Sequence, residues 1–410
     1  MESEERYGVA VLRTLDVELT TASKVDVSRA VSEGRRKRRI RRWSRIGACA
    51  AVTAVALASV PLVAGALAGE DPSVGDSIAA TAPATAPPPA PTPPTACTVS
   101  RLPIPGGHPM ALVTGADPTG RLLLGRAYPE RQSGAYPVVI WDNGVPRTVN
   151  VPGKDQALRD ANTAGVAVGA GWHDAGPLPY VYRDGKVSVL RGVATGEAVA
   201  INEAGVIVGQ GGGNPDSVPV VWRSATEPAT YLPVPSGWTG NAVAVSEDGS
   251  VLALLRAKGN KSPQAYLWGP DGTGRALPKP SDGEYFRPYS IQRNWAYGVA
   301  YSEELFARGG RERSVTPVRL DVTTGEYTRL AAVSMLPSEA NDSGWLVGST
   351  DTGRAVLSAG RGMLTLPDMD NHKSATANMA STISEDGRVV AGQADDADGV
   401  IQPVVWHCQP

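Results

Sequence analysis

The chain has 410 residues, of which 42% are apolar, so it can bury a large core and is not disordered throughout. Its 39 basic and 41 acidic side chains give a formal charge of −2, which excludes a protein coated in basic charge for binding nucleic acid. The 46 glycines and 34 prolines favour many turns over a helical bundle, and three cysteines are too few for a disulfide scaffold, a zinc ribbon or an iron–sulfur cluster.

Residues 1–45 are predicted to form a cytoplasmic basic tail. They hold 12 basic and 7 acidic side chains, and Arg35–Arg45 (RRKRRIRRWSR) contains eight of the basic ones. Because this cluster directly precedes an apolar segment, we interpret it as a topology signal that contacts anionic lipid, and we expect no nucleic-acid partner. The first 34 residues are either a solvated leader or a docking segment for a cytoplasmic partner.

Residues 46–69 are predicted to form a single transmembrane helix. The 24 residues carry no charge, and at 1.5 Å each they span about 36 Å, more than a hydrocarbon core of roughly 30 Å. The preceding basic cluster predicts a cytoplasmic N-terminus and an extracellular C-terminal domain. Two alternatives remain: a signal peptide cleaved after Ala66-Leu67-Ala68, and a lipid anchor on Cys49, which opens the apolar run instead of closing it.

Residues 70–96 are predicted to form an extended linker. The segment contains eight prolines among alanine and threonine, a composition that favours polyproline II and cannot pack a core. At about 3.1 Å per residue it would reach roughly 80 Å, which suits a stalk that lifts a domain away from a membrane.

Residues 97–410 repeat one pattern of short Val- and Ile-rich runs separated by tight turns. The clearest copy is Glu197–Pro235, with EAVAINEAGVIVGQ, PVVWR and ATYLPVP. The turn residue that closes each copy recurs at intervals of 40 to 50 residues, at Gly120, Gly165, Gly205, Gly249, Asn294, Gly344 and Gly387. This period predicts an all-β, seven-bladed β-propeller with one four-stranded sheet per blade. Asn294 replaces glycine in the fifth copy, and we expect it to adopt the left-handed conformation there.

The third run of most copies ends in an aromatic residue: Trp141, Tyr182, Trp222, Trp268 and Trp406. Side chains at equivalent positions of successive blades are expected to fill the space between them. The alternative is an exposed tryptophan stripe that serves as a platform for sugars.

The last copy lacks its outermost strand, and a run of that type, CTVSRLPIP, begins at Cys97. We therefore predict that the N-terminal strand pairs with the C-terminal one and closes the ring. Cys97 and Cys408 flank the cut between these strands, so a disulfide between them is expected. Such a bond requires an oxidising compartment outside the cytoplasm.

The repeats resemble those of the HAF-repeat family of bacterial extracytoplasmic proteins. The family's first stretch is matched by Ala198–Asn202 (AVAIN) with Gly205, and its second by Ala265–Trp268 (AYLW), although the name-giving histidine is absent. Ser384–Ala391 (SEDGRVVA) also resembles the turn of TolB-type propellers. Both resemblances imply a propeller outside the cytoplasm, and neither implies a function.

No pattern in the sequence identifies a catalytic, cofactor or metal site. The four histidines fall in different copies, and Asp395–Gly399 (DDADG) is too short for a calcium loop. The fifth copy departs most from the repeat around residues 285–313. The departure reflects either drift or a specialised binding loop, for which the candidate residues are Tyr285, Phe286, Arg287, Tyr289, Arg293, Trp295 and Tyr297.

These observations favour a membrane-anchored monomer that acts as a binding or sensory module for an unknown protein or glycan outside the cell, at the cell envelope. The alternatives are a hydrolase or lyase with its site on the central face of the propeller, and a secreted propeller. Several ionisable side chains within hydrogen-bond reach of one another in the central cavity would favour the enzyme.

Overall fold

The computed structural model describes residues 91–130, 135–213, 215–258, 263–302, 315–330, 335–360, 362–369 and 377–410. The predicted tail, membrane helix and most of the linker lie outside the described residues. Within the described residues the one helix is the 3-10 turn η1 (Pro105–Gly107), and none is long and apolar enough to cross a membrane.

The described strands form seven antiparallel sheets of four strands each. In chain order, the first sheet contains β2 (Met110–Ala116), β3 (Leu122–Tyr128), β4 (Val138–Asp142) and β5 (Val145–Val149), and the second contains β6 (Lys154–Ala161), β7 (Ala167–His173), β8 (Gly176–Arg183) and β9 (Lys186–Val189). The third contains β10 (Gly196–Ile201), β11 (Ile207–Gly211), β12 (Val218–Trp222) and β13 (Thr230–Tyr231), and the fourth contains β14 (Trp238–Val245), β15 (Val251–Ala257), β16 (Pro263–Trp268) and β17 (Gly274–Ala276). The fifth contains β18 (Glu284–Gln292), β19 (Trp295–Ser302), β20 (Thr316–Asp321) and β21 (Tyr327–Arg329), and the sixth contains β22 (Met335–Ala340), β23 (Leu346–Thr350), β24 (Ala355–Ala359) and β25 (Gly362–Thr365). The seventh sheet contains β26 (Met379–Ile383), β27 (Val389–Asp395), β28 (Ile401–Gln409) and β1 (Ala96–Arg101).

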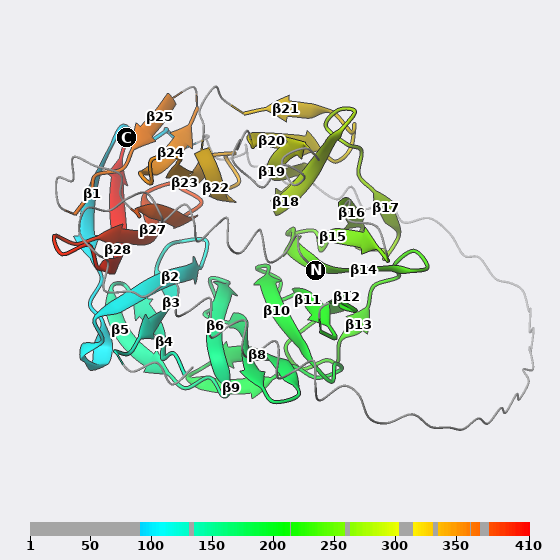
Figure 1. Cartoon of the computed structure of the whole chain (residues 1–410), viewed down its shortest axis with the longest axis horizontal. Coiled ribbons are helices and arrows are strands. Elements are labelled where there is room, and N and C mark those ends of the chain that lie inside the picture. The colour runs from blue at the N-terminus through cyan, green and yellow to red at the C-terminus, as the bar shows by residue number, and fades with distance from the viewer. Residues whose placement is uncertain are drawn as a thin grey trace, which may run out of the picture. The chain divides into compact units, whose positions relative to one another are not determined.

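The seven sheets are the blades of a closed propeller (Figure 1). The first strand of each blade lies nearest the axis and contacts the first strands of both neighbouring blades, and β2 contacts β26 to complete the circle. The predicted all-β, seven-bladed architecture is therefore confirmed. The apolar core is divided into layers between successive blades, because each sheet buries its two faces against its neighbours.

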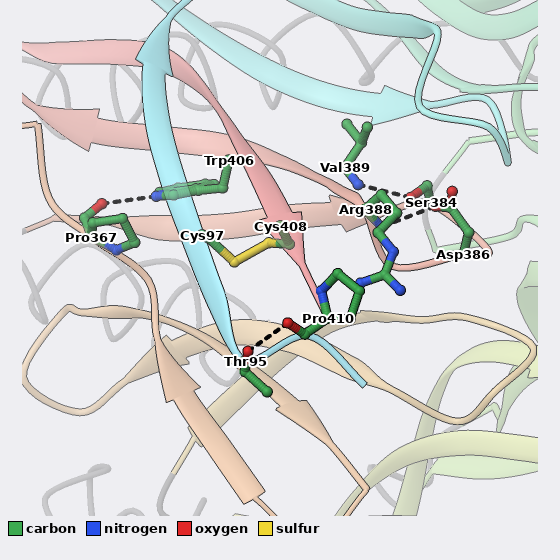
Figure 2. The surroundings of a disulfide bond; sticks show 10 residues. All are labelled: Thr95, Cys97, Pro367, Ser384, Asp386, Arg388, Val389, Trp406, Cys408 and Pro410. Carbon is green, nitrogen blue, oxygen red and sulfur yellow. Dashed lines mark hydrogen bonds between the residues drawn. A yellow bond between two sulfur atoms is a disulfide. The ribbon is translucent and has the colours of Figure 1, made fainter. Parts of the chain in front are cut away.

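The closing blade combines the two ends of the domain, as the sequence predicted. Strand β1 pairs antiparallel with β28, and Cys97 lies opposite Cys408 in the register. A disulfide joins their sulfur atoms, with 4.0 Å between the two Cα atoms (Figure 2). Thr95 adds a hydrogen bond from its Oγ1 to the carbonyl oxygen of Pro410, 2.8 Å away. The end of the seam is thus held by covalent and polar contacts together.

The aromatic residues of the third strands lie between blades, which rules out an exposed platform for sugars at these positions. Trp141, Trp222, Trp268 and Trp406 are fully buried, and Tyr182 is 3% exposed. Each indole Nε1 donates to a backbone carbonyl just beyond the outermost strand of the preceding blade: to Pro103, Arg191, Pro233 and Pro367, at 2.7 to 3.0 Å. The tryptophan therefore fills the space between blades and also satisfies a backbone carbonyl there.

The turns confirm six of the seven predicted left-handed positions, all of them glycines with φ between 69° and 86°. The prediction for the fifth blade was wrong by one residue, because Arg293 (φ 53°) adopts this conformation instead of Asn294. Its turn is one residue shorter: Ile291 pairs with Ala296, whereas Ile201 pairs with Ile207. Shortening the turn moves the left-handed residue one place earlier in the chain.

Loss of the disulfide is expected to destabilise the ring. The cysteines are 311 residues apart, and closing so long a loop restricts the unfolded chain, so Cys97→Ser should lower the free energy of unfolding by about 3–5 kcal/mol. Denaturant unfolding of the oxidised full-length protein measures the change. Cys49→Ser is the matched control and should leave the transition unchanged; equal stability of the Cys97→Ser variant and the unmodified protein would contradict a structural role for the bond.

Candidate functional site: the axial turn face

The turns between the first and second strands of all seven blades lie at one end of the ring, close to the axis. We call this surface the axial turn face. Each turn begins with a polar residue, and the second residue of four of these turns is acidic: Glu203, Glu247, Asp342 and Glu385. The repeat therefore places a carboxylate near the axis in four of the seven blades.

In three of the turns the first residue is an asparagine that links its blade to the next. Asn202 is 3% exposed, and its Oδ1 accepts the N–H of Val206 in its own turn at 2.8 Å. Its Nδ2 donates to the carbonyl of Ser246 in the following blade at 2.9 Å. Asn162 and Asn341 make the same two kinds of contact. One buried amide thus closes its own turn and joins two blades, which explains the asparagine of the repeat.

The second residues form a further set of links between blades. The Glu203 carboxylate accepts the N–H of Thr163 at 3.0 Å, and the Glu247 carboxylate accepts the N–H of Glu203 at 3.1 Å. Glu385 accepts the N–H of Asp342 at 2.7 Å. These carboxylates are therefore bound to the backbone of the preceding blade and stabilise the ring before they contact any ligand.

Two more carboxylates lie deeper along the axis, at equivalent positions of two blades. Every inner strand has a one-residue bulge, and Asp160 and Glu339 directly follow the bulges of β6 and β22. Asp160 Oδ2 accepts the N–H of Ile201 at 2.8 Å. Glu339 is bonded in the same way to the N–H of Ile383 and to the hydroxyl of Thr382. Each carboxylate thus bridges its blade and the next.

The environment raises the pKa of the axial carboxyl groups. Burial raises the pKa of Asp160 to about 7, and the charges of Glu203 and Glu247 add to this effect against two backbone hydrogen bonds. Burial likewise raises the pKa of Glu339 to about 8, assisted by the charge of Asp160. The pKa of Glu385 rises to about 7, mainly by burial. Near neutral pH these groups can therefore take up or release protons.

A shallow depression of about 300 Å³ lies on this face and is lined by Ser246, Glu247, Asp248, Arg293 and Asp342. The Arg293 guanidinium lies 3.4 Å from the Asp342 carboxylate. Its positive charge is close to several carboxylates, so the depression combines charged groups of both signs. The arrangement can attract cations and exchange protons, whereas the described residues contain no cluster suited to holding a metal ion.

The seven candidate binding residues lie in two neighbouring strands and their turn, and not in a separate loop. Tyr285, Phe286, Arg287 and Tyr289 belong to β18, Arg293 lies in the turn, and Trp295 and Tyr297 belong to β19. Tyr285, Phe286 and Tyr297 are at most 7% exposed, and the Arg319 guanidinium covers the Trp295 ring at 4.1 Å. Of the seven, Arg293 alone contributes to the depression. A binding role for the set stays a prediction, and its continuation at 303–313 lies outside the described residues.

The axial carboxylates were missed by sequence reasoning, although a signal was present. Asp160 and Glu339 replace the small residue two places before the turn, where the best copy has Ala200. In a repeat, a charged residue at a position that holds a small residue in most other copies indicates a local role that those copies lack. Only the arrangement of the blades around the ring shows that Asp160 and Glu339 face the same axis.

Several other sequence candidates have ordinary structural roles. Asp396 Oδ1 accepts the N–H groups of Asp398 and Val400, and Asp396 Oδ2 accepts from Gln402, so its oxygens are used within the turn at 395–399. His407 is exposed and lies at the edge of a second depression, between the closing blade and the first. His372 lies outside the described residues.

The comparisons with known proteins support the same class, a β-propeller. No family model and no curated protein matches the chain. It is similar to the structure of an oligogalacturonate lyase in complex with manganese, with 12% identity and a TM-score of 0.51 over 78% of this chain and 98% of the other. TolB from Acinetobacter baumannii has 14% identity and a TM-score of 0.39, over 74% of this chain and 68% of TolB. The β-propeller domain of the Trilobed protease from Pyrococcus furiosus has 11% identity and a TM-score of 0.44, over 63% of this chain and 84% of that domain. At 12% identity, the similarity to the lyase structure shows the fold alone. Membership of the HAF-repeat family stays a prediction.

The stability of the propeller is expected to fall as pH rises from about 5 to about 8. Asp160 and Glu339 have a higher pKa in the folded chain than in the unfolded chain. Their contribution is therefore complete below about pH 4 and is lost as pH rises through the folded values. Because both residues are half-buried, we expect about 1–2 kcal/mol from each carboxyl.

Thermal or denaturant unfolding at several pH values measures this effect. The double variant D160N/E339Q keeps hydrogen-bond acceptors and removes the titration of these two groups. Its stability should therefore depend less on pH in this range, with Glu385 contributing the remaining dependence. The control D271N removes an exposed carboxyl whose pKa is lowered by hydrogen bonds from Thr273, and its effect should be confined to the acidic side. A steep pH dependence that persists in the double variant would assign the effect to other groups.

The buried amide links predict a second stability effect. Asn202→Ala leaves the N–H of Val206 without its partner and removes one of the two donors to the carbonyl of Ser246, which keeps the N–H of Gly249. The change should cost about 1–3 kcal/mol of unfolding free energy. Asn150→Ala is the control, because Asn150 is exposed, and its cost should stay within about 0.5 kcal/mol. Equal costs in denaturant unfolding would show that the link between blades is unimportant.

Proposed function

We propose that the protein is a single-pass membrane protein whose propeller lies outside the cytoplasm and binds a protein or glycan of the cell envelope. The observation that carries this proposal is the Cys97–Cys408 disulfide at the seam of the ring. Structural disulfides persist in oxidising compartments and are rare in the cytoplasm. The basic tail and apolar segment of the sequence support the same location.

The geometry also supports recognition as the role of the propeller. Its strands form a rigid ring, and its turns and loops present two broad faces on which binding residues can be held in place. The carboxylates of the axial turn face accept backbone N–H groups. Their first role is therefore structural, and the ring offers a stable platform for a partner.

The seam cysteines provide the test of location. In intact cells they should not react with a membrane-impermeant maleimide, and they should react after treatment with a membrane-impermeant reductant. The experiment uses the Cys49→Ser variant, which lacks the third thiol. The variant that also carries Cys97→Ser and Cys408→Ser gives the labelling that does not come from the seam cysteines. If the two cysteines are reduced in cells and react only after lysis, the propeller is cytoplasmic and the proposal is wrong.

The alternative function, a hydrolase or lyase acting at the axis, is favoured by one observation. Asp160 and Glu339 share the axial region, and burial brings the pKa of both close to neutral, as general acids and bases require. If this alternative holds, turnover of an envelope polysaccharide by the full-length protein should be lost in both D160N and E339Q. Turnover that persists in both variants would exclude these residues as catalysts.

A further inference from the structure

The second blade differs from the others at the start of its inner strand, on the face opposite the turns. Within the described residues, β6 has a second irregularity, between Lys154 and Ala157, whereas each of the other inner strands has one. Asp155, inside this irregularity, has a φ of 49°, which is strained for a residue other than glycine. Bulges and strained residues recur beside binding sites, where they redirect side chains.

A guanidinium group lies beside this irregularity and is engaged by two tyrosines. Arg126 Nε donates to Tyr128 Oη at 2.6 Å, and the guanidinium carbon lies 5.0 Å from the centres of both the Tyr128 and Tyr136 rings. The rings themselves are 4.9 Å apart. Within the described residues no carboxylate pairs with Arg126, and its Nη1 and Nη2 atoms make no hydrogen bond. The two terminal nitrogens therefore remain available to an anionic group.

Neighbouring residues hold these groups in place. Gln156 is 7% exposed; its Oε1 accepts the N–H of Tyr136 at 3.0 Å, and its Nε2 donates to the carbonyl of Gly153 at 2.6 Å. One buried amide thus ties the connection that carries Tyr136 to the start of the second blade. The Tyr128 phenol is partly buried, which raises its pKa and keeps it neutral as a partner of Arg126.

A second polar pair borders the same place. His173 Nε2 lies 2.9 Å from Tyr180 Oη. At Gly153 a Cβ atom would lie 2.9 Å from His173 Nε2 and 2.7 Å from the carbonyl oxygen of Trp172. Glycine therefore lets the histidine approach the strand start closely. The contacts run without a break from Arg126 through Tyr136, Gln156 and Gly153 to His173, and we call these residues the second-blade patch.

We propose that the second-blade patch binds an acidic sugar residue of a glycan. This inference rests on the proposed function and names the ligand class. A carboxylate or sulfate would accept two parallel N–H groups from Arg126 Nη1 and Nη2. The half-buried rings of Tyr128 and Tyr136 offer apolar surface to the C–H face of a sugar. His173 and the exposed Lys154, which pairs with Trp172 in the strand register, would supply polar groups to its hydroxyls.

Titration calorimetry with three tetrasaccharides of the same linkage tests the proposal on the full-length protein in detergent. The first probe is built of glucuronic acid, the second of glucose, and the third of sulfated glucose. We expect the acidic probes to bind at least tenfold more tightly than the neutral one, and the tighter of the two identifies the acid that is recognised. Failure of both acidic probes to bind, or equal affinity for the neutral probe, overturns the proposal.

Substitutions locate the binding. Arg126→Gln should lose at least tenfold in affinity for the acidic probe, while its affinity for the glucose probe stays the same. The affinity of Arg126→Lys should lie between those of Arg126→Gln and the unmodified protein, because lysine keeps the positive charge but lacks the paired N–H groups of the guanidinium. Arg223→Gln is the matched control, an exposed arginine on the opposite face, and should bind as the unmodified protein does. Melting temperatures confirm that each variant folds.

Unchanged affinity in Arg126→Gln would overturn the assignment of this patch. The labelling of the seam cysteines does not involve Arg126, so the inference and the proposed location can fail separately.

Discussion

Closure of the ring is the constraint on which the rest of the structure depends. No blade can bury both faces alone, so each needs a neighbour on both sides, and the seventh must meet the first. The inner strands approach so closely that a Cβ atom on Gly115 would lie 1.9 Å from the carbonyl oxygen of Arg159 in the next blade. The strand pair β1–β28 and its disulfide convert an open row of sheets into this closed arrangement.

Closure also buries the first residue of most turns on the axial turn face, so the polar groups of that residue need partners within the ring. The buried amides of Asn162, Asn202 and Asn341 meet this need by serving two blades each. The carboxylates of the same turns serve as further acceptors. Since burial raises the pKa of several axial carboxyl groups, the links that hold the ring together also make its stability depend on pH.

The two faces of the ring therefore have different characters. On the axial turn face the charged residues follow the repeat and bind neighbouring blades. On the opposite face, the start of β6 breaks the repeat and gathers a guanidinium, two tyrosines and a histidine. A feature that supports ring closure is expected in most blades. A feature found in a single blade is not explained by ring closure. This contrast is why we place the proposed recognition where the start of β6 in the second blade meets Arg126 and Tyr128 of β3 in the first.

The amino-acid sequence by itself determined the number of blades, the strand order, the buried tryptophans and the seam with its cysteines, because each follows from a local pattern repeated along the chain. It could not determine that Asp160 and Glu339, in the second and sixth blades, interact across one axis, or that Arg126 meets Tyr136 beside β6. Those contacts join residues of different repeats or across long turns, and ring geometry alone sets their distances. The fifth-blade turn shows the same limit, since one residue fewer moved the left-handed position from Asn294 to Arg293.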